Sequence, residues 1–310
     1  MKFPNILMSV SKYGVIELNA KNEVVWEYKL DEPERIYGLD YNPKTSNILV
    51  GYGDRVSKVR KVDKGKCFDF VINSRASLHS AFFFDTDENI IATATKYDGI
   101  YVTIPDKSPD FINLQDYFEK PDDLHEWGCE DWTHINFAKA YDDYIYATLY
   151  RHPTDRGKDG AILLINKDDY SLHRIISHYS LNRPHFAIPH PTIEQFMLVA
   201  NTGSESVTAI SKKTGATYWE YKINNGRNHI IPEEGRSPIA CNFGAHYLET
   251  FNIAPTTDHA LLMVIPNLRI ARVIDLITGS TLHEYKVPEY IYKDAGIGED
   301  PRPFQAKILY

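Results

Sequence analysis

Four short β-prone segments each carry a histidine at or near their start: LHSAFFF (78–84), THINFAKA (133–140), PHFAIP (184–189) and AHYLETF (245–251). The four histidines, which are His79, His134, His185 and His246, are spaced by 55, 51 and 61 residues. That interval is about the length of one four-stranded propeller blade with its loops. Equivalent positions of successive blades meet at one end of the central axis. The segments therefore predict a β-propeller in which four imidazoles face one another.

The rest of the chain repeats the same unit. Short aromatic and β-branched runs alternate with turn clusters, and a closing strand recurs as VVWEYKL (24–30), ATYWEYKI (216–223) and TLHEYKV (281–287). Alignment of the innermost strands gives six starts, at Tyr37, His79, His134, His185, His246 and Phe304. The sequence predicts an all-β fold, a single six-bladed propeller domain over residues 1–310. In it, PFQAKILY (303–310) shares a blade with three N-terminal strands and closes the ring.

Composition narrows the class of protein. The 21 Tyr and 14 Phe favour a β-rich chain, because aromatic side chains fit a pleated, half-buried surface. A formal charge of −8 argues against nucleic acid as a partner. The three cysteines are too few and too far apart for a disulfide framework or a paired-cysteine metal motif. With no signal-like or membrane-spanning segment, we expect a soluble cytoplasmic protein without a membrane partner; the oligomeric state stays open.

The sharpest motif is DWTHIN (131–136), which is followed after one strand by Arg151. It resembles the D-W-x-H-x-N signature of the PAPS-independent arylsulfotransferases, a propeller family in which a conserved arginine follows the motif. His185 and the strand FMLVANTG (196–203) extend the likeness into the next blade. The sequence departs from the family in reading ANTG (200–203) at the family's D-N-G turn, and in the added His246.

The resemblance implies roles for individual residues. His185 matches the histidine that becomes transiently sulfated, and His79 matches a further histidine of the same pocket. The groups that hold the sulfuryl oxygens match His134, Asn136 and Arg151. Residues expected to contact the substrate are Trp132, Asn136, Arg151 and His246. The resemblance thus implies an arylsulfotransferase-like enzyme that acts on a small phenolic or aromatic molecule and needs no cofactor.

The residue types themselves are compatible with sulfuryl transfer. In such a reaction charge spreads over the peripheral oxygens, so fixed donors supply most of the catalysis. Arg151 offers a permanently charged planar fork. A neutral imidazole at His185 can attack directly, and a second imidazole can move a proton. Asn136 lies two residues after His134 on a strand, so the two side chains share a face.

Two other functions stay open. Four imidazoles meeting on the axis would suit one Fe, Cu, Ni or Zn ion with positions left for substrate, as in an oxygenase, lyase or isomerase; the ligands would be His79, His134, His185 and His246. Arg151 in the same pocket opposes that hypothesis, because a cation beside a dication is unfavourable. The third alternative is a non-catalytic propeller that binds a small molecule or another protein.

Overall fold

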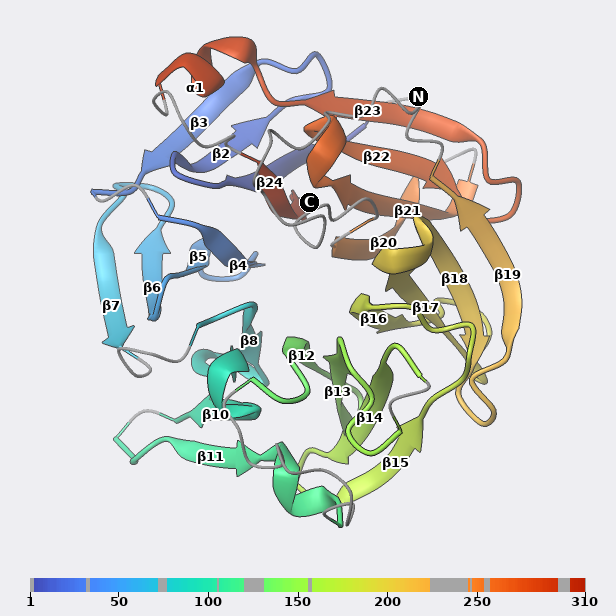
Figure 1. The fold of residues 1–310 in the computed structure, drawn as a ribbon. Helices are drawn as coiled ribbons and strands as arrows, with labels where there is room; N and C mark the ends of the chain where they lie inside the picture. Colours follow the sequence, from blue (N-terminus) through green and yellow to red (C-terminus); the bar gives the residue numbers. More distant parts are fainter. Residues whose placement is uncertain are drawn as a thin grey trace, which may run out of the picture.

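The computed structural model is a six-bladed β-propeller, in which six four-stranded antiparallel sheets surround one axis (Figure 1). The structure describes residues 3–31, 34–71, 77–104, 106–119, 131–155, 158–223, 245, 247–253, 257–294 and 302–309. The predicted fold class and blade number are therefore confirmed.

The blades are numbered here in chain order, each from its innermost strand outward. Blade 1 contains β4 (Ile36–Asn42), β5 (Asn47–Tyr52), β6 (Arg55–Arg60) and β7 (Lys66–Val71). Blade 2 contains β8 (Ala81–Phe84), β9 (Thr86–Ala94), β10 (Gly99–Thr103) and β11 (Asp110–Asn113). Blade 3 contains β12 (Ile135–Tyr141), β13 (Tyr144–Leu149), β14 (Ala161–Asn166) and β15 (Leu172–Ile176).

The second half of the ring follows the same order. Blade 4 contains β16 (Pro184–Pro189), β17 (Phe196–Asn201), β18 (Ser206–Ser211) and β19 (Thr217–Lys222). Blade 5 contains β20 (Tyr247–Ile253), β21 (Thr257–Ile265), β22 (Ile270–Asp275) and β23 (Thr281–Lys286). Blade 6 contains β24 (Pro303–Leu309), β1 (Asn5–Val10), β2 (Gly14–Leu18) and β3 (Val24–Lys29). Short helical segments are η1 (Thr95–Tyr97), η2 (Leu114–Tyr117), η3 (Thr202–Ser204), η5 (Pro266–Leu268) and α1 (Glu289–Asp294).

Blade 6 joins the two ends of the chain, as the sequence predicts. β24 pairs antiparallel with β1, with Ile6 opposite Ile308. The side chain of Gln305 on β24 accepts a hydrogen bond from the Leu39 N–H of blade 1 at 2.6 Å. The backbone N–H of Gln305 donates to Ser9 Oγ at 3.0 Å. A single buried glutamine thus links the N-terminal strand, the C-terminal strand and the first blade.

The axis is packed with side chains from the inner strands. Phe82, Phe137 and Phe186 come from blades 2, 3 and 4, and the Phe137 and Phe186 ring centroids are 3.9 Å apart. Tyr247 of blade 5 continues the cluster at 4.8 Å from Phe186. All four rings are buried, so the two ends of the axis are separated by a packed core. No helix in the described ranges is long and apolar enough to cross a membrane.

Candidate functional site

The starts of the inner strands meet at one end of the axis, which we call the histidine mouth. Ring contacts with centroid separations of 4.8–6.0 Å connect successive blades there. In order, the chain of rings is Phe304, Tyr37, His79, His134, Tyr150 and His185. His79 and His134 touch directly, edge to face, at 4.8 Å. His185 joins the cluster through Tyr150, and His246 lies outside the described residues.

Asp131 and His134 form a carboxylate–imidazole pair in the turn before β12. Asp131 Oδ1 lies 2.7 Å from His134 Nδ1. Both residues have left-handed backbone conformations, with φ of 64° and 52°, which fold the turn back on itself. A carboxylate can only accept here, so it fixes the tautomer with the proton on Nδ1. The lone pair of His134 is therefore on Nε2, where it can act as a base or a nucleophile.

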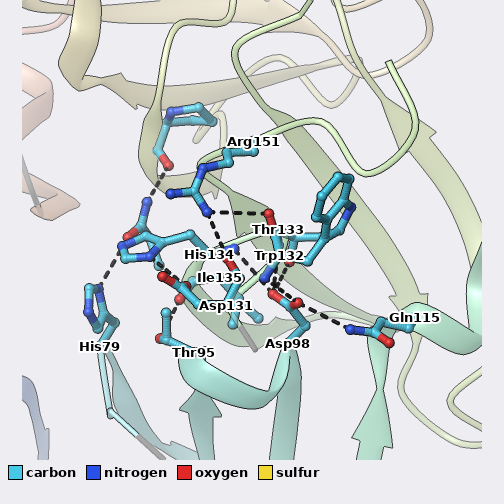
Figure 2. Close-up of polar contacts among 12 residues, drawn as sticks. His79, Thr95, Asp98, Gln115, Asp131, Trp132, Thr133, His134, Ile135 and Arg151 are labelled. Atoms are coloured by element: carbon cyan, nitrogen blue, oxygen red, sulfur yellow. Dashed lines mark hydrogen bonds and ion pairs between the residues drawn. The ribbon is translucent and has the colours of Figure 1, made fainter. Parts of the chain in front are cut away.

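The turn is held from the neighbouring blade by Asp98, the residue that follows η1. Its carboxylate accepts from Trp132 N at 2.7 Å, from Thr133 N at 2.8 Å and from Thr133 Oγ1 at 2.6 Å. The backbone N–H of His134 lies 3.2 Å from Asp98 Oδ1, the atom that also accepts both bonds from Thr133. Burial raises the pKa of Asp98, and the hydrogen bonds oppose that rise. Figure 2 shows these bonds converging on the Asp98 carboxylate, so the position of His134 depends on the preceding blade.

His79 is oriented by Asn136. Asn136 Nδ2 donates to the Pro184 carbonyl oxygen at 3.1 Å, which leaves Oδ1 facing His79 Nδ1 at 3.2 Å. The amide oxygen is an acceptor, so His79 carries its proton on Nδ1 and its lone pair on Nε2. Burial and the neighbouring His134 lower the pKa of His79 to about 3. His79 is thus a neutral imidazole at physiological pH.

The two arginines of the mouth flank Tyr150. The guanidinium carbons of Arg183 and Arg151 lie 5.3 and 5.9 Å from the Tyr150 ring centroid. Arg151 Nη1 donates to the Asp131 carbonyl oxygen at 2.7 Å and is 3.3 Å from the Trp132 carbonyl oxygen. Arg151 therefore supports the turn that carries His134 through one nitrogen and adds positive charge beside His134.

The indole of Trp132, which is predicted to contact the substrate, is hydrogen bonded within the protein. Its Nε1 donates to the Pro153 carbonyl oxygen at 2.9 Å. Figure 2 shows the ring directed away from His79 and His134. Asn136 is also engaged, because both ends of its buried amide are hydrogen bonded within the protein.

The described histidines do not by themselves form a metal site. Among the residues that the structure describes, no group of three or more His, Cys, Asp or Glu side chains is arranged to hold an ion. Nδ1 of His79 lies against Asn136 and Nδ1 of His134 against Asp131, while Nδ1 of His185 lies 3.1 Å from the Arg183 carbonyl oxygen. The four-ligand alternative includes His246, which is outside the described residues, and stays a hypothesis.

Sequence reasoning missed Asp98 and Tyr150. Asp98 occupies the left-handed position after a short 3-10 turn, and Glu205 and Arg269 occupy the same position in blades 4 and 5. This recurrence identifies the turn in each blade. It does not identify the hydrogen-bond partners of Asp98, because these lie in the next blade. Tyr150 stands directly before Arg151 in the sequence, and its contact with both His134 and His185 follows only from the curvature of the ring.

Fold and site together define the class of protein: a six-bladed β-propeller with a histidine-containing centre at one end of its axis. Among solved structures, the chain is similar to a chain of a nidogen–laminin complex, with a TM-score of 0.66 at 10% identity over 99% of this chain and 98% of that one. It is also similar to a streptogramin B lyase, with a TM-score of 0.54 at 13% identity over 92% of this chain and 74% of that one.

A third similar structure is the virginiamycin B lyase from Staphylococcus aureus, with a TM-score of 0.51 at 15% identity over 82% of this chain and 70% of that one. At such identities these likenesses show the fold alone. No protein-family model and no curated protein sequence matches the chain.

Proposed function

We propose that the protein is an enzyme that transfers a sulfuryl group from an aryl sulfate to a small phenolic acceptor, with His134 as the nucleophile. The observation that carries the proposal is the 2.7 Å contact between Asp131 Oδ1 and His134 Nδ1. A carboxylate in this position holds the imidazole in one tautomer and offsets the positive charge that develops when Nε2 is substituted. The motif that resembles the arylsulfotransferase signature contains both residues.

The reaction then proceeds in two displacements. His134 Nε2 attacks the sulfur, the bond from sulfur to the aryl oxygen breaks, and the phenolate leaves with the electron pair and takes a proton from water. The sulfated imidazolium keeps its proton on Nδ1, which donates a hydrogen bond to Asp131 Oδ1. The oxygen of the acceptor phenol next attacks the sulfur and loses its proton to water, and His134 regains its lone pair. The enzyme supplies orientation and fixed charge, which suits a loose transition state.

The surroundings of His134 support an anionic aromatic substrate. Tyr150 contacts His134, Tyr37 stacks on the neighbouring His79, and Phe304 in turn contacts Tyr37. Arg151 and Arg183 place two permanent positive charges beside Tyr150. Neutral His79 adds no like charge next to the imidazolium formed at His134. In this assignment His185, at the far end of the contact chain, binds substrate rather than carrying the sulfuryl group.

The test uses 4-nitrophenyl sulfate as donor and phenol as acceptor. We expect release of 4-nitrophenolate and, after rapid acid quenching without acceptor, a protein mass increase of one SO3 group on the peptide containing His134. The His134→Asn variant should lose both signals, while His185→Asn should keep the adduct. An adduct on His185, or turnover that persists in His134→Asn, overturns the assignment. The exposed His173 provides the control variant His173→Asn.

A second candidate is a lyase, in which His134 Nε2 removes a proton from carbon as a leaving group departs. The observation that favours it is the same unprotonated Nε2, which suits a general base as well as a nucleophile. Two of the similar propellers are lyases by name. An elimination product that depends on His134, formed without any sulfated enzyme, would favour this reaction.

A further inference from the structure

A group of charged side chains lies inside the ring, beyond the aromatic core and toward the end opposite the histidine mouth. The strand β12 begins next to His134 and ends at Tyr141, so Lys139 lies near its far end. Four inner strands contribute one charge each, namely Asp40 from β4, Lys139 from β12, Glu249 from β20 and Lys307 from β24. None of these residues belongs to the site described above.

A pocket of about 430 Å³ opens beside these charges. Its walls include Lys139, Lys307, Tyr141, Tyr247, Pro189 and His190. Lys139 and Lys307 both line the pocket with side chains that are only 15% and 18% exposed. The pocket thus combines ammonium groups with aromatic and proline walls, which is the composition of a small-molecule site.

The two lysines are engaged to different extents. Lys307 Nζ lies 2.6 Å from Glu249 Oε1, a short charge-assisted hydrogen bond. Lys139 Nζ lies 3.7 Å from Asp40 Oδ2, which is longer than a hydrogen bond. Asp40 already accepts from the backbone N–H groups of Tyr41 and Phe83, at 3.0 and 3.2 Å. Lys139 is therefore the lysine with capacity to react with a ligand in the pocket.

The local charge balance restricts the ligand. The two ammonium groups are balanced by Asp40 and Glu249, and Asp142 adds a further negative charge to the pocket lining, so an anionic ligand would add an uncompensated charge among largely buried groups. A neutral carbonyl compound adds none. Tyr141 and Tyr247 line the pocket, and Lys139 Nζ lies 5.7 Å from the Tyr141 ring centroid, so a ring on the ligand finds aromatic neighbours close to the amine.

We propose that this pocket binds a small aromatic aldehyde and that Lys139 Nζ condenses with its carbonyl carbon to form an imine. Lys139 first gives one ammonium proton to water. The free amine then attacks the carbonyl carbon, a C=N bond replaces the C=O bond, and the oxygen leaves as water with the two hydrogens of the amine. The imine nitrogen takes back one proton from water. The resulting iminium carries one positive charge, like the ammonium it replaces, so Asp40 continues to balance it. Burial lowers the pKa of Lys139 and thereby increases the fraction of free amine, while Asp40 opposes that shift.

The experiment traps the imine with benzaldehyde and sodium cyanoborohydride at pH 7, followed by peptide mass mapping of the full chain. Lys139 should be benzylated several times faster than the exposed Lys21 and Lys213. Its advantage should shrink at pH 10, where exposed lysines also lose their protons. Labelling of Lys139 that is no faster than that of Lys21, or absent, overturns the proposal.

Three variants complete the design. Lys139→Arg keeps the charge but cannot form the imine, so its other lysines should label as in the wild type. Lys307→Arg is the matched control in the same pocket and should retain labelling at Lys139. His134→Asn should also retain it, because the histidine mouth lies at the other end of the axis. A loss of labelling in Lys307→Arg with an unchanged melting temperature would contradict the assignment to Lys139.

Discussion

The carboxylate of Asp98 binds both the backbone N–H and the side-chain hydroxyl of Thr133, at 2.8 and 2.6 Å, although the two residues belong to different blades. Thr133 precedes His134, so this contact fixes the turn that presents the imidazole. Positioning of the proposed nucleophile is thereby linked to the packing between blades 2 and 3. Asp98 therefore positions His134 from the neighbouring blade.

Asp98→Asn should reduce both stability and turnover. An amide nitrogen would face N–H donors that now meet an oxygen, so we expect a loss of about 1–3 kcal/mol in the free energy of unfolding. We also expect a fall in kcat with little change in KM, because the variant displaces His134 and leaves the residues proposed to bind the substrate in place. Glu205→Gln, at the equivalent turn of blade 4, is the matched control. Urea denaturation and steady-state kinetics measure both effects; equal behaviour of the two variants would contradict the role of Asp98.

Asp131→Asn should lower turnover by about 10²–10⁴-fold, the range of a lost acid–base or tautomer-fixing contribution. Its effect on stability should stay below about 1 kcal/mol, since the contact between Asp131 and His134 is partly exposed to solvent. Steady-state kinetics with 4-nitrophenyl sulfate measure the effect on turnover, and urea denaturation measures the effect on stability. A variant that loses stability and keeps its turnover would show that Asp131 is structural.

His79 should make the protein sensitive to acid. Its folded pKa of about 3 lies below the ordinary value of 6.5, so the unfolded chain binds the extra proton in that interval. The contribution of His79 to the free energy of unfolding is complete above pH 6.5. It is lost as the pH falls toward 3, by at most about 1.4 kcal/mol per pH unit. Urea denaturation of the wild type and of His79→Gln across this range measures the difference in slope. An identical pH dependence would contradict neutral burial of His79, and the exposed His173→Gln is the control.

Gln305→Leu should destabilise the closed ring. The variant leaves the buried Leu39 N–H without its acceptor at 2.6 Å, which costs about 1–3 kcal/mol. Gln195→Leu, at an exposed turn, should change stability by less than about 0.5 kcal/mol. Urea denaturation compares the two. Equal stability of both variants would show that strand pairing alone closes the propeller.

Chelation should leave turnover unchanged, because the proposed reaction uses only side chains. Turnover of 4-nitrophenyl sulfate and elemental analysis of the purified protein, both before and after treatment with EDTA, check this expectation. A near-stoichiometric transition metal that is lost in His134→Asn and in His246→Ala would instead favour the four-histidine metal hypothesis. His246→Ala should have little effect on sulfuryl transfer.

The blades and their closure follow from local patterns in the amino-acid sequence. Alternation of aromatic and β-branched residues with turns is a local property, and its repetition at intervals near 55 residues predicts strands, blade number and the shared position of His79, His134 and His185. The motif DWTHIN also identified the segment that holds the proposed nucleophile.

The partners of these residues, by contrast, depend on contacts between blades. Asp98 and Thr133 are 35 residues apart, and His79 and Asn136 are 57 apart. Their contacts depend on how neighbouring blades turn about the axis, which no local pattern encodes. The same curvature places Tyr150 between His134 and His185 and gathers Lys139, Asp40 and Lys307 from three strands. Periodicity sets which positions face the axis, whereas side-chain packing across blades sets the chemistry each position can perform.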